Sequence, residues 1–375
     1  MRKIKGFDGI RALCALAVLL GHAGLPQSWF PGDFAQLVYF TAFSHSQAVT
    51  VFFVLSGYLI SSILLQEKEA TGAINIRNFL LRRVLRLVPA YLFYLAVLAV
   101  LVGCNVLEVG GLSFLAALTY THNYLPKPYG SGHTNHLWSL SVEEQFYLVF
   151  PFLLRRFTLA NLRLVIGGLL LVGMATYELL PQVPLPAHDF VFEGELHNLN
   201  DLHLYQIWRL EYWIFPAGLY CLVGCLAGLH TRQLLALPIL NHWRGGLGLL
   251  VAVVLYFHPI GYRWEFGGLS NYLQCFGLAL FFLYLHRQQQ GVLVRLLEIP
   301  PLPYLGLISY GTYVWHGIFL TTGRGGWHYW WQGVPWGFAF TYVAAILSFH
   351  LLERPFLRLK GKYRPPGHSI VQGLS

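Results

Sequence analysis

Charged side chains are scarce in this sequence. Only 11% of its 375 residues are Asp, Glu, Lys or Arg, whereas 56% are hydrophobic. A soluble protein is usually about one-quarter charged. The shortage of charge therefore excludes a soluble protein and predicts an all-α bundle of helices that crosses a lipid bilayer.

Cysteine is also scarce, and a cleavable signal peptide is missing. The five cysteines fall mostly inside or at the ends of apolar runs, which argues against a disulfide framework or a zinc site. Cys221 and Cys225 share a helix face, but packing explains them better than a metal or redox role. The first apolar run has no small-residue cleavage site and leads into further spans. The net charge of +9 is dispersed between spans, so it predicts a membrane topology signal and no nucleic-acid partner.

Apolar segments near twenty residues long recur along the whole chain. There is no evident internal repeat, no long polar linker and no appended soluble domain, so residues 1–375 are predicted to form one integral-membrane domain. About ten spans are expected in it. Their approximate limits are 8–25, 47–65, 85–103, 137–154, 162–180, 212–229, 245–258, 271–286, 305–321 and 336–352.

Lysine and arginine are distributed unevenly between the connections. With "MRKIK" in the cytoplasm, the inner connections and the C-terminal tail hold most of them, while the long loop 181–211 is acidic and lies outside. This bias predicts that both termini are cytoplasmic. The apolar run 112–125 would reverse the bias if it were a span. We therefore expect 104–136 to be an outer segment that packs on protein.

The first span carries two polar side chains in "GIRALCALAVLLGHAG". Arg11 and His22 are eleven positions apart, which is three helical turns plus about 20°, so they share a face. At 1.5 Å per residue they lie roughly 16 Å apart along the axis. Alone, the arginine is explained by snorkelling and the histidine by packing. Their shared face and spacing favour a pair that engages one ligand.

Three arginines lie within one helical turn in "RNFLLRRVLRLVPAYLF". Arg82 and Arg86 are four apart and Arg83 and Arg86 three apart, so neighbouring guanidinium forks lie at the inner membrane surface. A positive-inside anchor on lipid headgroups is the plainer explanation. Guanidinium forks also bind phosphate in a bidentate manner, so the alternative is a soluble donor with several phosphates, such as coenzyme A.

A pair of carboxylates leads the fourth span in "HTNHLWSLSVEEQFYLVFP". Glu143 and Glu144 point roughly 100° apart on a helix, so only one of them faces a given cavity. Packing does not explain them, and we expect one to pair with an arginine or a histidine. His136 and Ser139 precede them on the outer rim. A metal site on His133 and His136 has no third ligand, so no metal is predicted.

Polar side chains also interrupt the ninth span in "LISYGTYVWHGIFL". They either line a cavity or hydrogen-bond between helices, which is the commoner role of such groups in a membrane. These residues are Ser309, Tyr310, Tyr313 and His316.

Six stretches together resemble the membrane acyltransferase family three, in order and at similar spacing across nearly the whole chain. They are "DGIRALCALAVLLGHAG", "FFVLSGYLI", "RNFLLRRVLRLVPAY", "HLWSLSVEEQFYLVFP", "SYGTYVWH" and "LLERP". The resemblance implies a bacterial inner-membrane protein that transfers an acyl group, most often acetyl from acetyl-CoA, to an acceptor at the outer face. Family acceptors include O-antigen and other surface polysaccharides, peptidoglycan, exopolysaccharides and macrolides. The esterase-like soluble domain of some members is missing, which leaves the acceptor open.

The family's motif residues correspond to six positions in this sequence: Arg11, His22, Arg82, Arg83, Arg86 and Glu143. The resemblance implies that coenzyme A phosphates bind the inner arginines, with Arg11 near the pantetheine entrance. An imidazole suits the general-base step on an acceptor hydroxyl, so His22 is the expected base. Glu143 is expected to fix the tautomer of His22. Direct transfer is favoured because no Gly-x-Ser-x-Gly elbow is present, and an acyl-histidine relay stays open.

A proton-coupled transporter or flippase of a glycan or a lipid-linked intermediate is the competing class, with Arg11, His22 and Glu143 as its ion site. The sequence shows no pair of Gly- or Pro-broken inverted repeats that would favour it. A structural scaffold would leave the polar residues without a reason. We therefore predict a membrane O-acyltransferase with an acyl-CoA donor and an extracytoplasmic saccharide acceptor.

Overall fold

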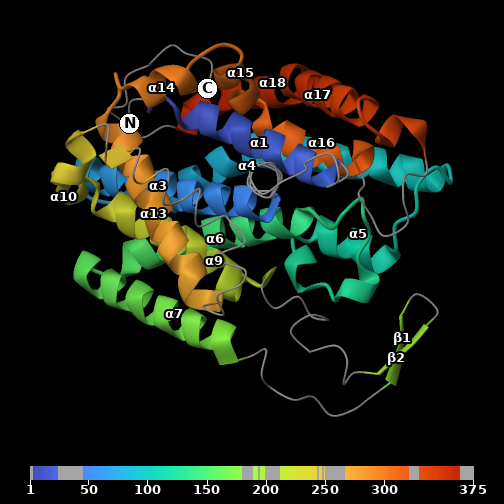
Figure 1. Cartoon of the computed structure of the whole chain (residues 1–375), viewed down its shortest axis with the longest axis horizontal. Helices are drawn as coiled ribbons and strands as arrows, with labels where there is room; N and C mark the ends of the chain where they lie inside the picture. The colour runs from blue at the N-terminus through green and yellow to red at the C-terminus, as the bar shows by residue number, and fades with distance from the viewer. Residues whose placement is uncertain are drawn as a thin grey trace, which may run out of the picture.

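The protein is described here by a computed structural model. The described residues are 3–23, 45–179, 189–192, 195–198, 212–242, 245–246, 249, 267–320 and 329–363. They form a bundle of helices with one small antiparallel hairpin, in which β1 (Asp189–Phe192) pairs with β2 (Glu195–Asn198) (Figure 1). Most of the predicted span 245–258 and of the acidic loop 181–211 lies outside the described residues.

Each predicted span except 245–258 coincides with a helix of the structure. These helices are α1 (Phe7–His22), α3 (His45–Thr71), α4 (Ile76–Gly103), α6 (Leu137–Arg156), α7 (Leu159–Leu179), α9 (Ile214–Leu229), α13 (Gly267–Arg287), α15 (Leu302–Leu307) with α16 (Ser309–Phe319), and α17 (Trp336–Ser348) with the π-turn η9 (Phe349–Glu353). The agreement follows from the apolar runs, because a helix satisfies its own backbone groups where water is absent.

The remaining elements are short. They are α5 (Gly111–Leu118), η2 (His122–Tyr124), η3 (Lys127–Tyr129), α10 (Thr231–Leu234), η7 (Pro238–Asn241), α14 (Val292–Leu297), η8 (Trp330–Gln332), α18 (Arg354–Leu359) and η10 (Lys360–Tyr363). A spanning helix needs about 20 residues. The segment 104–136 contains only α5, η2 and η3 between the ends of α4 and α6, so it holds no spanning helix.

Four described helices are long and apolar enough to cross a membrane. They are Ser46–Thr71, Ile76–Gly103, Leu159–Thr176 and Trp336–Leu359. The outer face of α7 is apolar as well, since Leu164 is 76% and Leu171 68% exposed. A bilayer would cover such side chains. The fold is thus that of a helical integral membrane protein.

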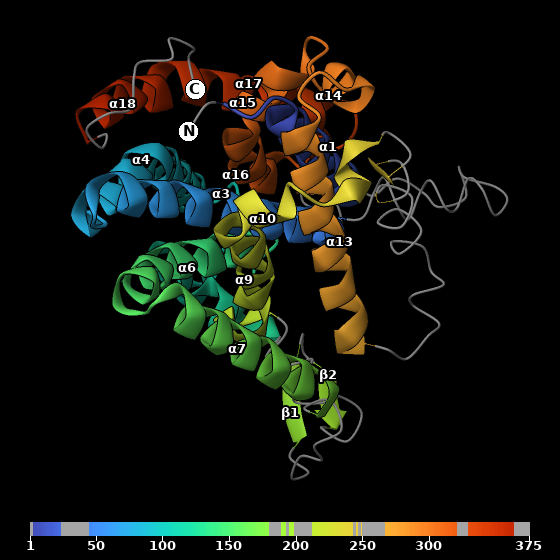
Figure 2. The ribbon, with the colours of Figure 1, turned by 90° about the vertical axis from the view of Figure 1, so that its left-hand side faces the viewer.

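Helix α3 lies in the middle of the bundle, with α17 and α18 on one side and α7 on the other (Figure 1, Figure 2). Glycines let α3 and α9 touch backbone to backbone. A Cβ on Gly57 would lie 1.9 Å from the carbonyl oxygen of Cys221, and one on Gly224 2.0 Å from that of Val54. Small residues allow helices to approach closely in a bilayer. This contact fixes the position of Ser56, which neighbours Gly57 in the sequence.

The segments predicted to share the inner side contact one another at one end of the bundle. Lys68 near the end of α3 donates to the carbonyl of Leu154 near the end of α6, at 2.9 Å. Arg232 in α10 pairs with Glu69 of α3 at 2.8 Å. The ends of α3 and α6 and the start of α10 therefore lie together, which is expected of segments on one side of a membrane.

Candidate active site

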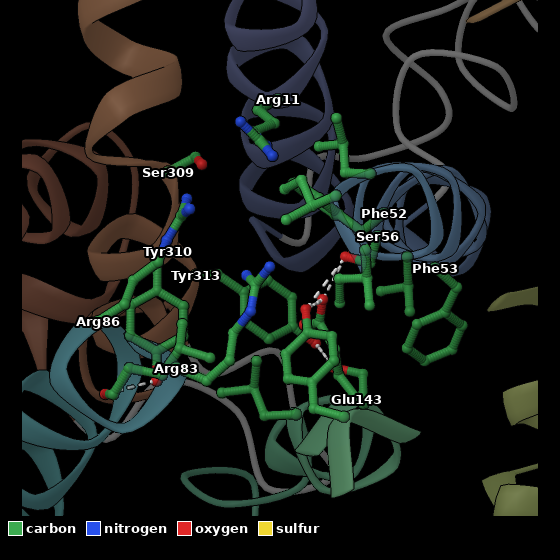
Figure 3. A pocket seen from close by; sticks show the side chains of 18 residues that line it. Arg11, Phe52, Phe53, Ser56, Arg83, Arg86, Glu143, Ser309, Tyr310 and Tyr313 are labelled. Atoms are coloured by element: carbon green, nitrogen blue, oxygen red, sulfur yellow. Dashed lines mark hydrogen bonds between the residues drawn. The ribbon is translucent and has the colours of Figure 1, made fainter. Parts of the chain in front are cut away.

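A cavity of about 130 Å³ lies between α1, α3, α4, α6 and α16 (Figure 3). On α3 its lining runs from Val49 to Ile63, which is about 21 Å of helix at 1.5 Å per residue. Its polar lining is Arg11, Ser56, Arg83, Arg86, Ser139, Glu143, Tyr147, Ser309, Tyr310 and Tyr313. The cavity is therefore extended along the bundle and combines cationic, anionic and hydroxyl groups.

Three guanidinium groups reach the cavity from two helices. Arg11 comes from α1, while Arg83 and Arg86 come from α4, where their spacing of three places them on one face (Figure 3). Arg11 is held by Asp8, with 2.9 Å between Nη1 and Oδ1. Among the described lining residues the one carboxylate is Glu143. The excess of positive charge suits an anionic ligand.

Aromatic rings position Arg83. Its Cζ lies 5.0 Å from the ring centroid of Tyr147 and 5.4 Å from that of Phe79. The negative face of an aromatic ring attracts a guanidinium group, and stacking leaves the in-plane N–H groups able to bind a ligand. Arg83 is therefore held in place by groups that do not use its hydrogen-bond donors.

Arg82 has a different environment, although it precedes Arg83 in the sequence. It does not line the cavity; it pairs with Glu67 at 3.2 Å between Nη2 and Oε2, and it donates to a backbone carbonyl of η10 at 2.5 Å. Consecutive residues of a helix point about 100° apart. The predicted arginine cluster is thus divided, with Arg83 and Arg86 at the cavity and Arg82 in an ion pair between α3 and α4.

Glu143 accepts hydrogen bonds at Oε1 from the hydroxyl groups of Ser56 and Tyr147. The sequence predicts that Glu143 holds the imidazole of His22, whereas the bonds it makes here join α3 to α6. Neither hydroxyl donor was predicted. The signals for them are the spacing of four between Glu143 and Tyr147 and the serine beside Gly57 in an apolar run.

His22 ends α1 and is not part of the cavity lining, although it shares its helix with Arg11. Its Nδ1–H donates to the carbonyl of Val18 at 2.9 Å, because a carbonyl oxygen can only accept. In the neutral ring the lone pair is then on Nε2. The backbone of α1 thus fixes the tautomer of His22, a role that the sequence predicts for Glu143.

Two further histidine rings lie beside His22. The centroid of the His316 ring in α16 lies 4.9 Å from that of His22, and the His136 ring lies 4.5 Å from that of His316. His136 directly precedes α6. We call these three rings, from α1, α16 and the residue before α6, the imidazole row. The sequence singles out each histidine separately, but only the fold brings them together.

Tyr313 lies between the cavity and the imidazole row. It lines the cavity, and its ring centroid is 5.3 Å from that of His316 and 5.7 Å from that of His136. Its hydroxyl donates to the carbonyl of His136 at 2.9 Å and is hydrogen-bonded with the Ser139 hydroxyl at 2.6 Å. The two polar regions therefore adjoin through one aromatic side chain.

The histidines considered as metal ligands are bound to the backbone instead. His133 donates from Nδ1 to the carbonyl of Gly317 at 2.9 Å, and His136 donates from Nε2 to that of Val314 at 3.1 Å. Within the described ranges, no group of three or more His, Cys, Asp or Glu side chains could hold a metal ion. Cys221 and Cys225, like the other cysteines, are free thiols.

Residues 4–353 match the family described as "Acyltransferase domain". The chain is 37% identical over 166 residues to a protein named "Putative O-acetyltransferase SACOL0978" of Staphylococcus aureus (strain COL), which is 41% of this chain and 25% of that protein. It is 28% identical over 334 residues to O-acetyltransferase OatA of Staphylococcus aureus (strain NCTC 8325 / PS 47), which is 84% of this chain and 50% of that protein. No solved structure matches it.

The family match includes the arginines of the cavity, Glu143 and all three histidines of the imidazole row. The chain spans a quarter to a half of the length of these two relatives. The resemblance carried by the six sequence stretches is confirmed, and the chain belongs to the acyltransferase domain family.

Proposed function

We propose that the chain is a membrane O-acyltransferase. It moves an acyl group, acetyl in our proposal, from acyl-CoA on the cytoplasmic side to a hydroxyl of a saccharide on the outer side. The observation that carries the proposal is a cavity with three guanidinium groups that adjoins a row of imidazoles. Family membership and the similarity to O-acetyltransferases support the reaction type.

The proposal includes about ten spans and cytoplasmic termini in a bacterial inner membrane. The bias of Lys and Arg supports this orientation, and the contacts between segments predicted to lie inside support a common side for them. With this orientation Arg83 and Arg86 lie toward the cytoplasmic end of α4, and His22 lies at the outer end of α1. The donor then enters from the arginine end, and the acceptor approaches from the histidine end.

Arg83 and Arg86 bind the phosphates of the donor, and Arg11 lies beside its pantetheine arm. A guanidinium group presents N–H donors in a planar fork that matches phosphate oxygens. The cavity lining extends about 21 Å along α3, which suits an extended acyl-pantetheine arm. Arg82 instead supports the start of α4 through its pair with Glu67.

His22 acts as the general base. A hydroxyl attacks a thioester slowly unless its proton leaves during the attack, and a positioned base contributes about 10²–10⁴-fold. Nε2 of His22 takes the proton as the oxygen–acyl bond forms, and the proton passes to the coenzyme A sulfur as the carbon–sulfur bond breaks. The Val18 carbonyl keeps the lone pair on Nε2. Glu143 balances part of the arginine charge and holds Ser56 and Tyr147.

Membranes that contain the protein, supplied with acetyl-labelled acetyl-CoA and a surface-glycan extract, test the proposal. We expect labelled glycan from the wild type and a loss of about 10²–10⁴-fold in His22→Gln, with coenzyme A binding retained. His230→Gln is the matched control, because His230 lies directly after a helix and, like His22, donates from Nδ1 to the carbonyl one turn earlier, here Leu226, at 2.8 Å. Glycan movement across the membrane without use of the acetyl donor would overturn the proposal in favour of a transporter.

A further inference from the structure

Helices α3 and α6 pass the cavity in the same direction, and three contacts fix their register. The contacts join Phe53 to the ring of Trp138, Ser56 to the carboxylate of Glu143, and Lys68 to the carbonyl of Leu154. Positions along the cavity can therefore be compared between the two helices at 1.5 Å per residue. Along α3, the lining residues Phe53 and Ile63 are about 15 Å apart.

One end of the cavity is cationic. Tyr147 follows Glu143 by about one turn of α6, so it lies on the Ile63 side of the contact between Ser56 and Glu143. The guanidinium group of Arg83 stacks on the Tyr147 ring, with 5.0 Å between Cζ and the ring centroid. The cavity arginines of α4 are therefore found toward Ile63. We call this the arginine end.

The opposite end of the cavity is lined by six residues, none of which is charged. They are Val49, Phe52, Phe53, Ser139, Leu140 and Tyr313. Figure 3 shows Phe52 and Phe53 across the cavity from Arg86. The Ser139 and Tyr313 hydroxyl groups are 2.6 Å apart, and both reach the carbonyl of His136, at 3.2 and 2.9 Å. These hydroxyl groups are thus already bonded, and the end offers an apolar surface. We call it the aromatic end.

The wall of the aromatic end is backed by packed side chains. Phe53 is 2% exposed, and its ring meets that of Trp138 edge to face at 5.9 Å. Trp138 in turn stacks on Tyr212, with 4.0 Å between the ring centroids. Val49 and Leu140 are buried as well. A close-packed wall of this kind yields little to added volume, because overpacking is unfavourable. The aromatic end therefore limits the size of a group that it holds.

We propose that the aromatic end holds the acyl group of the donor, and that Phe52 and Phe53 restrict this group to a short chain. The proposal rests on the proposed function. With the donor phosphates at the arginine end, the pantetheine arm lies along α3 and its thioester reaches the aromatic end. The Tyr313 ring also contacts the imidazole row, so the acyl carbon lies next to the region from which the acceptor hydroxyl approaches. Phe52 and Phe53 are specificity-determining residues in this arrangement.

Transfer of labelled acyl groups from acetyl-CoA and from butyryl-CoA measures the selection in membranes that contain the protein. Each added methylene in an apolar pocket changes kcat/KM by about 10–200-fold. We expect the wild type to prefer acetyl-CoA by about tenfold or more. In Phe53→Ala this preference falls about tenfold, because the space left by the ring admits the longer chain. Both donors are compared in one preparation, so the ratio does not depend on the amount of folded protein.

Phe52→Ala is the second variant, since the Phe52 side chain is only partly buried and its loss disturbs packing less. Its preference for acetyl-CoA is expected to fall in the same direction. Ile63→Ala is the matched control, because Ile63 lines the cavity from the same helix at the arginine end. Both donors carry the same coenzyme A there, so the preference should stay as in the wild type even where the affinity for both donors falls. An unchanged preference in both phenylalanine variants, or a loss of preference in Ile63→Ala instead, would overturn the proposal.

Binding measurements separate this proposal from the proposed function. The Kd values of acetyl-CoA and butyryl-CoA are measured by calorimetry for the wild type and for Phe53→Ala in lipid nanodiscs. We expect the wild type to bind acetyl-CoA more tightly than butyryl-CoA and the variant to reduce this difference. A wild type that shows the difference without acyl transfer would reject the proposed function and leave the acyl site standing. Equal transfer of both acyl groups by the wild type would reject the selection of chain length alone.

Discussion

The cavity and the imidazole row adjoin at Tyr313, yet they hold their polar groups in opposite ways. In the cavity, the charges of Arg83 and Glu143 are positioned by other side chains, namely aromatic faces and hydroxyl groups. In the row, neutral rings are each tied to a backbone carbonyl. Fixed charges attract and orient an anion, whereas a neutral imidazole has a lone pair that can accept a proton. Under the proposed function, the contrast is consistent with donor binding at the cavity and with the base His22 in the row.

This division makes the two regions separable by experiment. Changes of the cavity arginines are expected to act on the affinity for the donor, and changes in the row on kcat and on its pH dependence. A variant that acts on both would show where the two regions are coupled.

The largest expected effect on donor binding comes from removing two cavity arginines together. In the double variant Arg83→Ala with Arg86→Ala, the Kd of coenzyme A should rise about 10²-fold or more. Each arginine supplies charged hydrogen bonds worth about 1.5–3 kcal/mol. Calorimetry on protein in lipid nanodiscs measures the change in Kd. The acidic limb of the pH profile of kcat should not move.

Arg82→Ala is the matched control on the same helix. We expect the Kd of coenzyme A to stay within a few-fold of the wild type while thermal stability falls. Glu67 is 2% exposed, and breaking a buried ion pair costs about 3–5 kcal/mol. An equal loss of donor affinity in Arg82→Ala would mean that the donor draws Arg82 out of its ion pair, against the division seen here.

Arg82 and Arg83 also show what the sequence can and cannot predict about the fold. The spans follow from local hydropathy, so their helices were predicted well, and the segment around α5 was correctly excluded as a span. The rotation of a helix about its axis depends on its neighbours instead. In the sequence, Arg82 and Arg83 can each share a helix face with Arg86, at spacings of four and three. Only the packing of α4 decides which two arginines face the cavity.

The imidazole row could not be predicted from the sequence, for a related reason. His136 and His316 lie far apart in the chain, and their ring contact depends on how α16 packs against the start of α6. The role of Val18 was equally hidden, because any residue at that position offers the same backbone carbonyl to His22. The residue types indicated the chemistry, whereas the partners that set their tautomers required the fold.

An intermediate effect is expected from removing the charge of Glu143, which is the one carboxylate among the described residues that line the cavity. Glu143→Gln keeps an acceptor oxygen for Ser56 and Tyr147 and removes the charge near Arg83. We expect kcat of acetyl transfer to fall about tenfold, because a charged hydrogen bond is replaced by a neutral one. The acidic limb should stay in place, since Val18 and not Glu143 bonds to Nδ1 of His22.

Glu144→Gln is the control, because Glu144 neighbours Glu143 on α6 but is not part of the cavity lining. A carboxylate that oriented the base directly would cost about 10⁴-fold when changed to its amide. A loss of that size in Glu143→Gln would place Glu143 with the imidazole row and remove the contrast between the two regions.

The smallest effect is expected at the boundary itself. Tyr313→Phe keeps the ring between the cavity and the row and removes only the hydroxyl, with its bonds to Ser139 and to the carbonyl of His136. A net hydrogen bond is worth about 0.5–1.5 kcal/mol, so kcat should fall about fivefold with donor affinity unchanged. Since the hydroxyl bonds to the backbone of His136 and not to its ring, the acidic limb should not move. A shift of the acidic limb of the pH profile in Tyr313→Phe would mean that the Tyr313 hydroxyl acts together with the imidazole row. Tyr313 would then belong to the row and not to the boundary between the row and the cavity.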